Sequence, residues 1–356
     1  MEKVKVRESN IELLRTISMF MILVIHANFV ALPRIDNNEL VSNTIPSITR
    51  FFIESLGIVA VNVFVFISGW FGINASRKRI FSFIYMVLFF LLGGGILFIL
   101  LGKNSFSLSW LLDVFQLSEK DWFIKAYFVL MIIAPVLNTY CKSAEEKTQR
   151  YVVIGFFLFE AIYGWVTGGR RFFVDGYGPL HFIGLYITAQ YVHYQKINSA
   201  PSSFAKKLFQ LPQWVDLLVY ISTSILTTVL MVFGVYFTKT SNSVFNLVYA
   251  YSNPLIIIGA VYLFLFFSKM KIRYSKIINW FGASSFAVYL FHGEATVRSL
   301  YFSPQIKYVF ENFTGKTCLG IIFIYLCIIY LISVLVDQIR IASWKGIWKL
   351  AEKRHT

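Results

Sequence analysis

Residues 11–31 read IELLRTISMFMILVIHANFVA, and this stretch decides the fold because it can cross a lipid bilayer as one helix. A hydrocarbon core of about 30 Å requires about 20 apolar residues. Arg15 and His26 interrupt the stretch eleven positions apart. That spacing is about three turns and about 16 Å along a helix, so both side chains point along one face. Ionisable groups inside a span cost about 2.5 kcal/mol or more, so this pair is the best indication of function in the chain.

The beginning of this helix carries a second pattern. Ser9-Asn10-Ile11-Glu12 has the spacing of a capping box, which predicts that the first helix starts at Ser9. Glu12 lies three positions before Arg15, a distance at which helical side chains form ion pairs. We therefore expect Glu12 to support Arg15.

Composition fixes the class of protein. Of 356 residues, 57% are hydrophobic and only 14% are charged, whereas a soluble chain has about 25% charged residues. The sequence predicts an all-α, polytopic integral membrane protein with one domain covering residues 1–356. About ten spans are expected, at residues 11–31, 56–73, 80–101, 122–140, 151–167, 177–194, 215–237, 244–267, 279–293 and 317–336.

The net charge of +15 is mainly a topology signal. With these spans, 22 of the 33 Lys and Arg residues fall on the side of the N-terminus, 10 fall on the other side, and Lys125 lies within a span. The positive-inside rule then places both termini in the cytoplasm. We expect membrane lipids as partners and no nucleic acid.

The segments between spans also receive predictions. Residues 32–55 are expected to form an external loop, 104–121 a short helix in the outer interface, and 195–214 a cytoplasmic linker. The basic stretch 338–356 is expected to lie along the inner leaflet. Pro135 and Pro254 should kink spans four and eight.

No motif indicates a permanently bound cofactor. The sequence has no P-loop, no dinucleotide-binding glycine pattern, no nucleophile elbow and no zinc spacing. Three scattered cysteines do not make a disulfide framework. No metal site is expected.

Each candidate residue has two interpretations. His26 is either a hydrogen-bonded histidine at a helix end or a general base, since imidazole titrates near neutral pH. Arg15 either reaches lipid phosphate or binds an anion. The triplet Arg77-Lys78-Arg79 is either a positive-inside anchor or a clamp for the phosphates of a cytoplasmic donor.

A polar group at the end of span nine is expected at the membrane level of His26. It contains Tyr289 and His292, followed by Glu294 and Arg298, and a structural network is the favoured interpretation. Further polar side chains are expected to face the bundle interior: Lys125, Tyr127, Glu160, His181, Gln190 and His193.

Four short motifs occur in a fixed order along the chain. Arg15 and His26 form an Arg-x10-His pattern, and span two ends in Phe66-Ile67-Ser68-Gly69 before the basic triplet. Span four opens with Trp122-Phe123 and closes with Pro135-Val136-Leu137-Asn138, and span nine ends in Tyr289-Leu290-Phe291-His292. Together they resemble the acyltransferase 3 family of integral membrane O-acyltransferases, and more narrowly its bacterial polysaccharide O-acetyltransferase branch. The resemblance covers nearly the whole chain.

The resemblance implies a ten-span bundle in a bacterial plasma membrane that uses an acyl-CoA, usually acetyl-CoA, from the cytoplasm. Arg15 would orient the donor, His26 would act as base or transient acyl carrier, and Arg77 and Arg79 would contact CoA phosphates. The acceptor would be a hydroxyl of a cell-surface or lipid-linked glycan. Two departures are present: Ile80-Phe81-Ser82 has no proline after the basic turn, and no second, hydrolase-like domain is expected.

Two other functions compete with an acetyl-CoA-dependent O-acetyltransferase. A secondary transporter of a glycan precursor or small anion would also need polar residues inside the bundle, but no inverted repeat is visible in the sequence. A non-catalytic scaffold would explain the hydrophobicity and leave the buried Arg and His without a role.

Overall fold

The computed structural model describes residues 7–115, 121–166, 173–198, 204–239 and 241–353. These residues form helices and turns and include no strand, which confirms the all-α prediction. Within them, 6 segments are long and apolar enough to cross a membrane: Ser9–Ala31, Thr44–Phe71, Arg77–Leu100, Trp122–Ser143, Gln213–Thr238 and Gly315–Lys353. The protein is therefore a multi-pass membrane protein.

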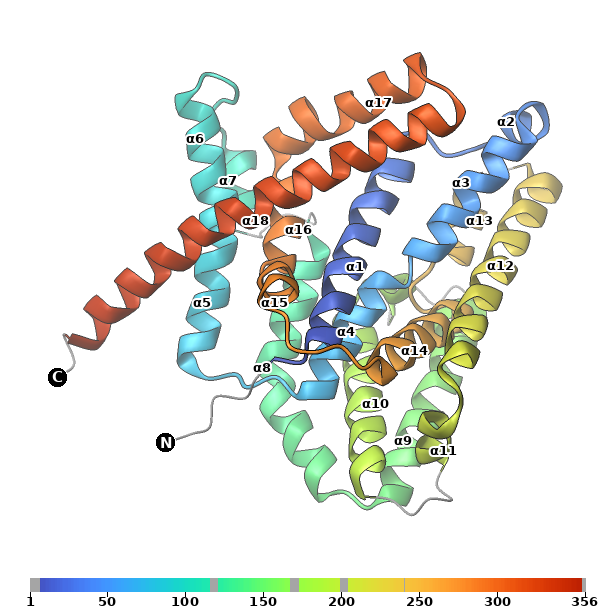
Figure 1. Cartoon of the computed structure of the whole chain (residues 1–356), viewed down its shortest axis with the longest axis vertical. Coiled ribbons are helices and arrows are strands. Elements are labelled where there is room, and N and C mark those ends of the chain that lie inside the picture. Colours follow the sequence, from blue (N-terminus) through green and yellow to red (C-terminus); the bar gives the residue numbers. More distant parts are fainter. Residues whose placement is uncertain (1–6, 116–120, 167–172, 199–203, 240, 354–356) are drawn as a thin grey trace.

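Helix α1 (Ser9–Ile25) lies at the centre of the bundle and continues into a π-helix, η1 (His26–Ala31) (Figure 1). It packs against α3 (Thr44–Gly57), α4 (Ala60–Phe71), α14 (Pro254–Lys269), α15 (Lys276–Ala283), α16 (Ser285–Gly293) and α18 (Gly315–Lys353). Because neighbours pack around α1, its polar residues Glu12 and Ser18 are buried within the protein.

The prediction that the helix starts at Ser9 is confirmed, but the Ser9 side chain does not form the capping-box hydrogen bond. The residue before the helix is Glu8, and its side chain makes no capping hydrogen bond. The Ser9 hydroxyl instead donates to Asn279 Oδ1 at 3.0 Å and accepts from the Ser275 amide at 2.9 Å. Tertiary contacts with the start of α15 have replaced the local cap.

The predicted external loop 32–55 is also wrong, because most of it is helical. It contains α2 (Asn37–Ser42) and α3, and α3 runs almost directly into α4. The buried Arg50 of α3 donates to the carbonyl oxygens of Asn28 at 2.9 Å and Pro33 at 2.7 Å. Glu54 accepts from Asn28 Nδ2 at 3.0 Å. These bonds clamp α3 to the end of η1.

Two predicted spans are broken. Residues 244–267 are divided between α13 (Ser241–Val248) and α14, and residues 279–293 are divided between α15 and α16 at Ser284. Pro254 does not kink a continuous helix, since it is the first residue of α14, a position that needs no amide donor. Asn253 fixes the break by accepting from Leu255 N at 3.0 Å and donating to Val248 O at 2.7 Å.

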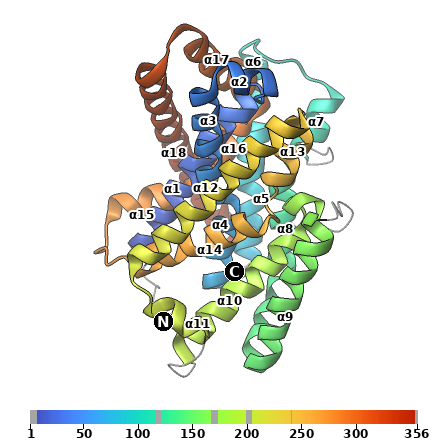
Figure 2. The same cartoon turned by 90° about the vertical axis from the view of Figure 1, so that its right-hand side faces the viewer.

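The middle of the chain forms a group of helices that projects at the end opposite α2, α6 and α17 (Figure 2). It contains α8 (Trp122–Ser143), which continues through Pro135, α9 (Glu146–Phe159), the π-helix η3 (Glu160–Val166) and α10 (Pro179–Asn198). A 3-10 turn, η4 (Val174–Gly176), precedes α10, and α11 (Phe204–Gln210) lies inside the expected linker 195–214. The expected spans 151–167 and 177–194 fall on helices outside the 6 apolar segments, so the total of about ten stays a prediction.

Helix α12 (Gln213–Thr238) packs against α14 and α3, while a second side of the bundle is formed by α5 (Arg77–Leu88), η2 (Phe89–Gly93) and α6 (Gly94–Leu100). The short helix expected within 104–121 is present as α7 (Leu108–Val114), although residues 116–120 lie outside the described part. The chain then closes with η5 (Val297–Phe302), α17 (Ser303–Asn312) and α18.

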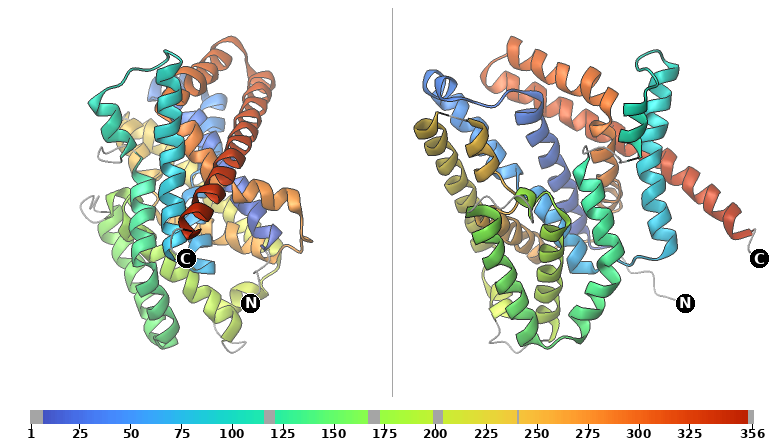
Figure 3. Two further views of the ribbon diagram at one scale, coloured as in Figure 1. Left: turned by 90° about the vertical axis from the view of Figure 1, so that its left-hand side faces the viewer. Right: turned by 180° about the vertical axis from the view of Figure 1, so that it is seen from behind.

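Helix α18 contains 39 residues and is about 58 Å long. It crosses one face of the bundle obliquely, and its last turns project past α5 (Figure 3). The stretch from 338 to Lys353 is thus no separate segment but the end of this helix. Tyr85 of α5 holds it through a 2.7 Å hydrogen bond to Ser343 and a ring contact with Trp344.

Candidate functional site

The centre of the site is a pair of histidines from distant parts of the sequence. His26 opens η1 and His292 lies in the last turn of α16. His26 Nδ1 and His292 Nε2 are 2.8 Å apart, and the ring centroids are separated by 5.0 Å. We expected the two residues at the same membrane level, and the structure places them in direct contact.

The remaining nitrogen of His292 fixes the direction of this hydrogen bond. His292 Nδ1 lies 2.6 Å from the Val288 carbonyl oxygen, which can only accept, so Nδ1 carries the proton. In the neutral pair, His292 Nε2 then accepts and His26 Nδ1 donates. This leaves Nε2 of His26 without a proton, which is the tautomer a general base requires.

A cavity of about 50 Å³ adjoins the His26 ring. Apart from His26, its walls are aliphatic and aromatic side chains from four helices and the α13–α14 break: Met19, Ile22, Ile25, Val61, Phe64, Trp122, Phe123, Tyr251, Phe286 and Tyr289. Tyr289 also packs edge-on against His292, with ring centroids 6.1 Å apart. Of the predicted supporting residues, Tyr289 thus lines the cavity, whereas His292 lies outside its lining and contacts the rings of His26 and Tyr289.

Arg15 lies nearer the N-terminal end of α1 than His26, and its Nη1 forms a 3.0 Å ion pair with Glu12 Oε1. The buried Glu12 also binds Arg7 at 3.1 Å through its other oxygen. The predicted ion pair is therefore present, and the guanidinium lies 6.0 Å from the ring of Phe71 at the end of α4. Arg15 remains partly accessible, with 27% of its side chain exposed.

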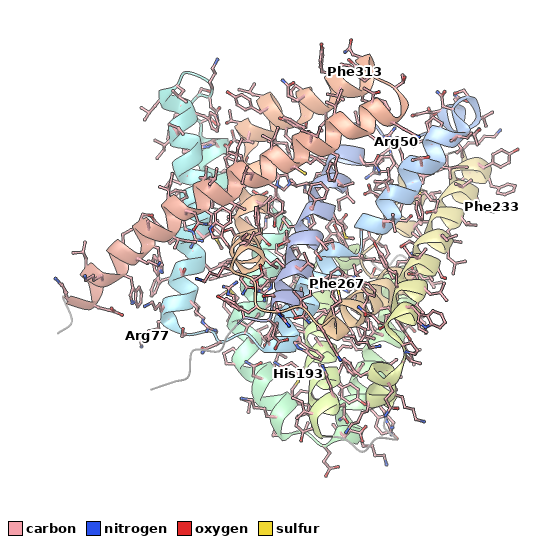
Figure 4. The ribbon with its side chains drawn as sticks, in the orientation of Figure 1. Arg50, Arg77, His193, Phe233, Phe267 and Phe313 are labelled. Atoms are coloured by element: carbon pink, nitrogen blue, oxygen red, sulfur yellow. The ribbon has the colours of Figure 1, made fainter. Side chains whose placement is uncertain are left out.

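Phe71 also lines a larger cavity of about 650 Å³, a size typical of ligand pockets. It is bounded by the end of α4, the segment 72–76, α8 and α10. The wall carries Asn138 and Gln190, which bond each other, and His193, whose ring stacks on Trp70 at 4.2 Å. Figure 4 shows His193 and Arg77 toward one end of the bundle and Arg50 toward the other.

The basic triplet forms the first turn of α5, immediately after Ser76 of the larger cavity. All three side chains are exposed. Lys78 lies 3.8 Å from Glu352 and 5.1 Å from the Trp348 ring of α18. Within the described residues, the side chains of Arg77 and Arg79 have no ion-pair or hydrogen-bond partner.

Helix α4 contributes side chains to both cavities. Phe64 lines the small cavity and Trp70 the large one, and between them Ser68 lies within 3.2 Å of the Tyr127 hydroxyl. A Cβ at Gly69 would lie 2.5 Å from the Tyr186 carbonyl oxygen, so only glycine allows α4 to approach α10 this closely. This explains the Ser-Gly pair that ends the span.

A second buried network was not expected as a unit. Glu160 and His181 were predicted to face the interior and are fully buried, with Glu160 Oε1 2.7 Å from His181 Nδ1. His181 Nε2 lies 3.0 Å from Asn62 Oδ1, and Asn62 donates to the Tyr251 carbonyl at 2.9 Å. The network holds the α13–α14 break against α4. No sequence spacing could have joined residues from four segments.

Comparison with known families gives one finding. The family described as "Acyltransferase domain" matches residues 8–338, which include the histidine pair, Arg15 with Glu12, the basic triplet of α5 and the lining of both cavities. No curated protein and no solved structure matches the chain. With the match covering almost the whole bundle, the chain belongs to the acyltransferase 3 family, and it is a membrane acyltransferase.

Proposed function

We propose that this protein transfers an acetyl group from cytoplasmic acetyl-CoA to a hydroxyl of a cell-surface or lipid-linked glycan at a bacterial plasma membrane. The observation that carries the proposal is the ordered histidine pair beside an apolar cavity. The same helix carries Arg15 about 16 Å from His26 along its axis and 6.0 Å from Phe71, which lines the larger cavity. A donor and an acceptor that enter from opposite ends could therefore meet at His26.

The donor end is supported by charge. CoA phosphates cannot enter hydrocarbon cheaply, so they stay at a basic surface while the pantetheine arm reaches inward. Arg77 and Arg79 offer two exposed guanidinium groups next to the larger cavity, and guanidinium binds phosphate oxygens in a bidentate manner. Lys78 adds charge there but also contacts α18. The excess of Lys and Arg on the N-terminal side supports a cytoplasmic location for this end.

The chemical step follows from the tautomer of His26. Nε2 of His26 accepts the proton of the glycan hydroxyl as the oxygen attacks the thioester carbonyl carbon. A C–O bond forms, the C–S bond breaks, and the imidazolium returns the proton to the CoA thiolate. His292 stabilises the transient charge on His26 through the shared hydrogen bond. Arg15, held by Glu12, orients the donor.

An acetyl-histidine intermediate is the alternative route for the same residues. There Nε2 of His26 attacks the thioester first, CoA thiol leaves, and the glycan oxygen then takes the acetyl group from the ring. Transport of a glycan precursor or small anion is the competing function, and the broken helices at α13–α14 and α15–α16 are the observation in its favour.

The test is acetyl transfer by purified protein in proteoliposomes supplied with radiolabelled acetyl-CoA and a glycan extract. Loss of a general base lowers rates by about 10² to 10⁴, so His26→Ala should lose product acetylation while retaining its elution profile and unfolding temperature. Lys316→Ala, an exposed change far along the chain, is the control. Acetylation at the wild-type rate by His26→Ala would contradict the proposal, and glycan flux without any acyl donor would favour transport.

A further inference from the structure

The cavity beside His26 is small and has rigid walls. A site that holds one water needs about 10 to 15 Å³, so about 50 Å³ accommodates roughly four non-hydrogen atoms. An acetyl group has a methyl, a carbonyl carbon and an oxygen, and a propionyl group adds one methylene. A butyryl group or anything longer exceeds this space.

Helical spacing explains why the wall is continuous. Met19, Ile22 and His26 follow one face of α1, and the pairs Val61/Phe64 of α4 and Phe286/Tyr289 of α16 are each three positions apart. Residues three or four positions apart lie on the same side of a helix. Three helices therefore turn adjacent side chains toward the same space.

Other rings back this wall. Phe286 stacks on Tyr289 at 5.8 Å and on Phe83 at 5.5 Å, and Phe123 stacks on Tyr127 at 5.8 Å. Trp122 packs against Tyr251 at 5.5 Å. Because close-packed side chains yield little, the cavity cannot expand for a longer chain without displacing several rings.

Phe64 is the wall residue most easily removed. It is half-buried, and none of the ring contacts described above involves it. Val61, one turn earlier on α4, is 4% exposed and lines the same cavity. Shortening either side chain should enlarge the cavity with little effect on the histidine pair.

We propose that this cavity is the acyl chamber of the transferase and that Val61 and Phe64 restrict the donor to acetyl-CoA and propionyl-CoA. The proposal rests on the function proposed above and adds which residues select the acyl group. The chamber receives the methyl end of the acyl chain while its carbonyl carbon lies at the His26 ring.

The experiment measures kcat/KM with acetyl-, propionyl-, butyryl- and hexanoyl-CoA in the proteoliposome assay. Wild-type protein should use butyryl-CoA poorly, and Phe64→Ala should raise the butyryl-to-acetyl ratio by about tenfold or more, since one methylene in a tight pocket is worth that much. Phe233→Ala, on the outer side of α12 (Figure 4), is the matched control and should keep the wild-type ratio. Val61→Ala is the second variant if Phe64→Ala does not fold.

The outcomes separate the two proposals. Acetyl transfer with an unchanged chain-length profile in both variants would overturn the chamber and leave the transferase function standing. Equal use of hexanoyl-CoA and acetyl-CoA by wild-type protein would do the same. No transfer from any donor by wild-type protein would overturn the transferase function and the chamber together.

Discussion

At the scale of single residues, the sequence predicted the participants better than their contacts. Arg15, Glu12 and His26 lie on one helix, so helical spacing alone placed the Glu12–Arg15 ion pair. His292 is 266 positions from His26, and only the packing of α16 against α1 brings the rings together. The hydrogen bond from His292 to Val288 fixes which ring nitrogens carry protons. The sequence could not predict it, because its acceptor is a backbone atom.

The hydrogen bond between His292 and His26 leads to a prediction for single residues. His292→Phe removes the acceptor for His26 Nδ1 and frees the His26 ring to rotate, and misplacement of about 1 Å costs about a hundredfold. We expect kcat to fall by about that factor with little change in KM for acetyl-CoA. His292→Gln retains a carbonyl oxygen that can accept from His26 and should recover part of the rate. Equal rates for both variants and wild type would contradict the positioning role.

At the scale of elements, hydropathy located the apolar stretches but not their breaks. Residues 244–267 are mostly apolar, and the break before Pro254 depends on the Asn253 side chain and on Asn62, which donates to the Tyr251 carbonyl. The missed helices α2 and α3 depend likewise on Arg50, whose bonds run to backbone atoms of another segment. Hydropathy is averaged over a window of residues, so it cannot predict contacts made by a single side chain.

The first turn of α5 carries the prediction at this scale. Replacing Arg77 and Arg79 together by Ala removes two guanidinium groups from the rim of the larger cavity. Loss of about 1.4 kcal/mol of phosphate binding raises a binding constant about tenfold, so KM for acetyl-CoA should rise by about that factor with kcat nearly unchanged. The double variant Lys345→Ala/Lys349→Ala removes the same charge from exposed positions of α18 and should leave KM unaltered. A matching rise in both variants would indicate a general charge effect.

At the scale of the whole molecule, the class of fold followed from composition, whereas the packing did not. The central place of α1 and the oblique course of α18 arise from contacts among many helices (Figure 1). The sequence suggested a span that ends near residue 336, because charges begin there. The structure continues the helix to Lys353, with Asp337 and Arg340 paired at 2.6 Å within it.

The length of α18 allows a test of topology. Lys316 and Lys349 are 33 positions and about 50 Å apart on one helix, more than the roughly 30 Å of a hydrocarbon core. In a chain lacking its three cysteines, Lys316→Cys should react with a membrane-impermeant maleimide on intact spheroplasts. Lys349→Cys should react only after permeabilisation. The opposite pattern would contradict a cytoplasmic C-terminus.

The π-helix that begins at His26 limits how many residues can be removed from this part of the chain. A π-helix accommodates one residue more than an α-helical turn, and η1 contains both His26 and Asn28, whose backbone carbonyl accepts from Arg50 of α3. Deleting Ala27 would move Asn28 into the place of Ala27, about 100° away around the helix in α-helical geometry. Arg15 and His26 would keep their mutual register, but the covering helices α2 and α3 would lose their anchor. The pairing of His26 with His292 and the attachment of α3 therefore depend on the same short turn.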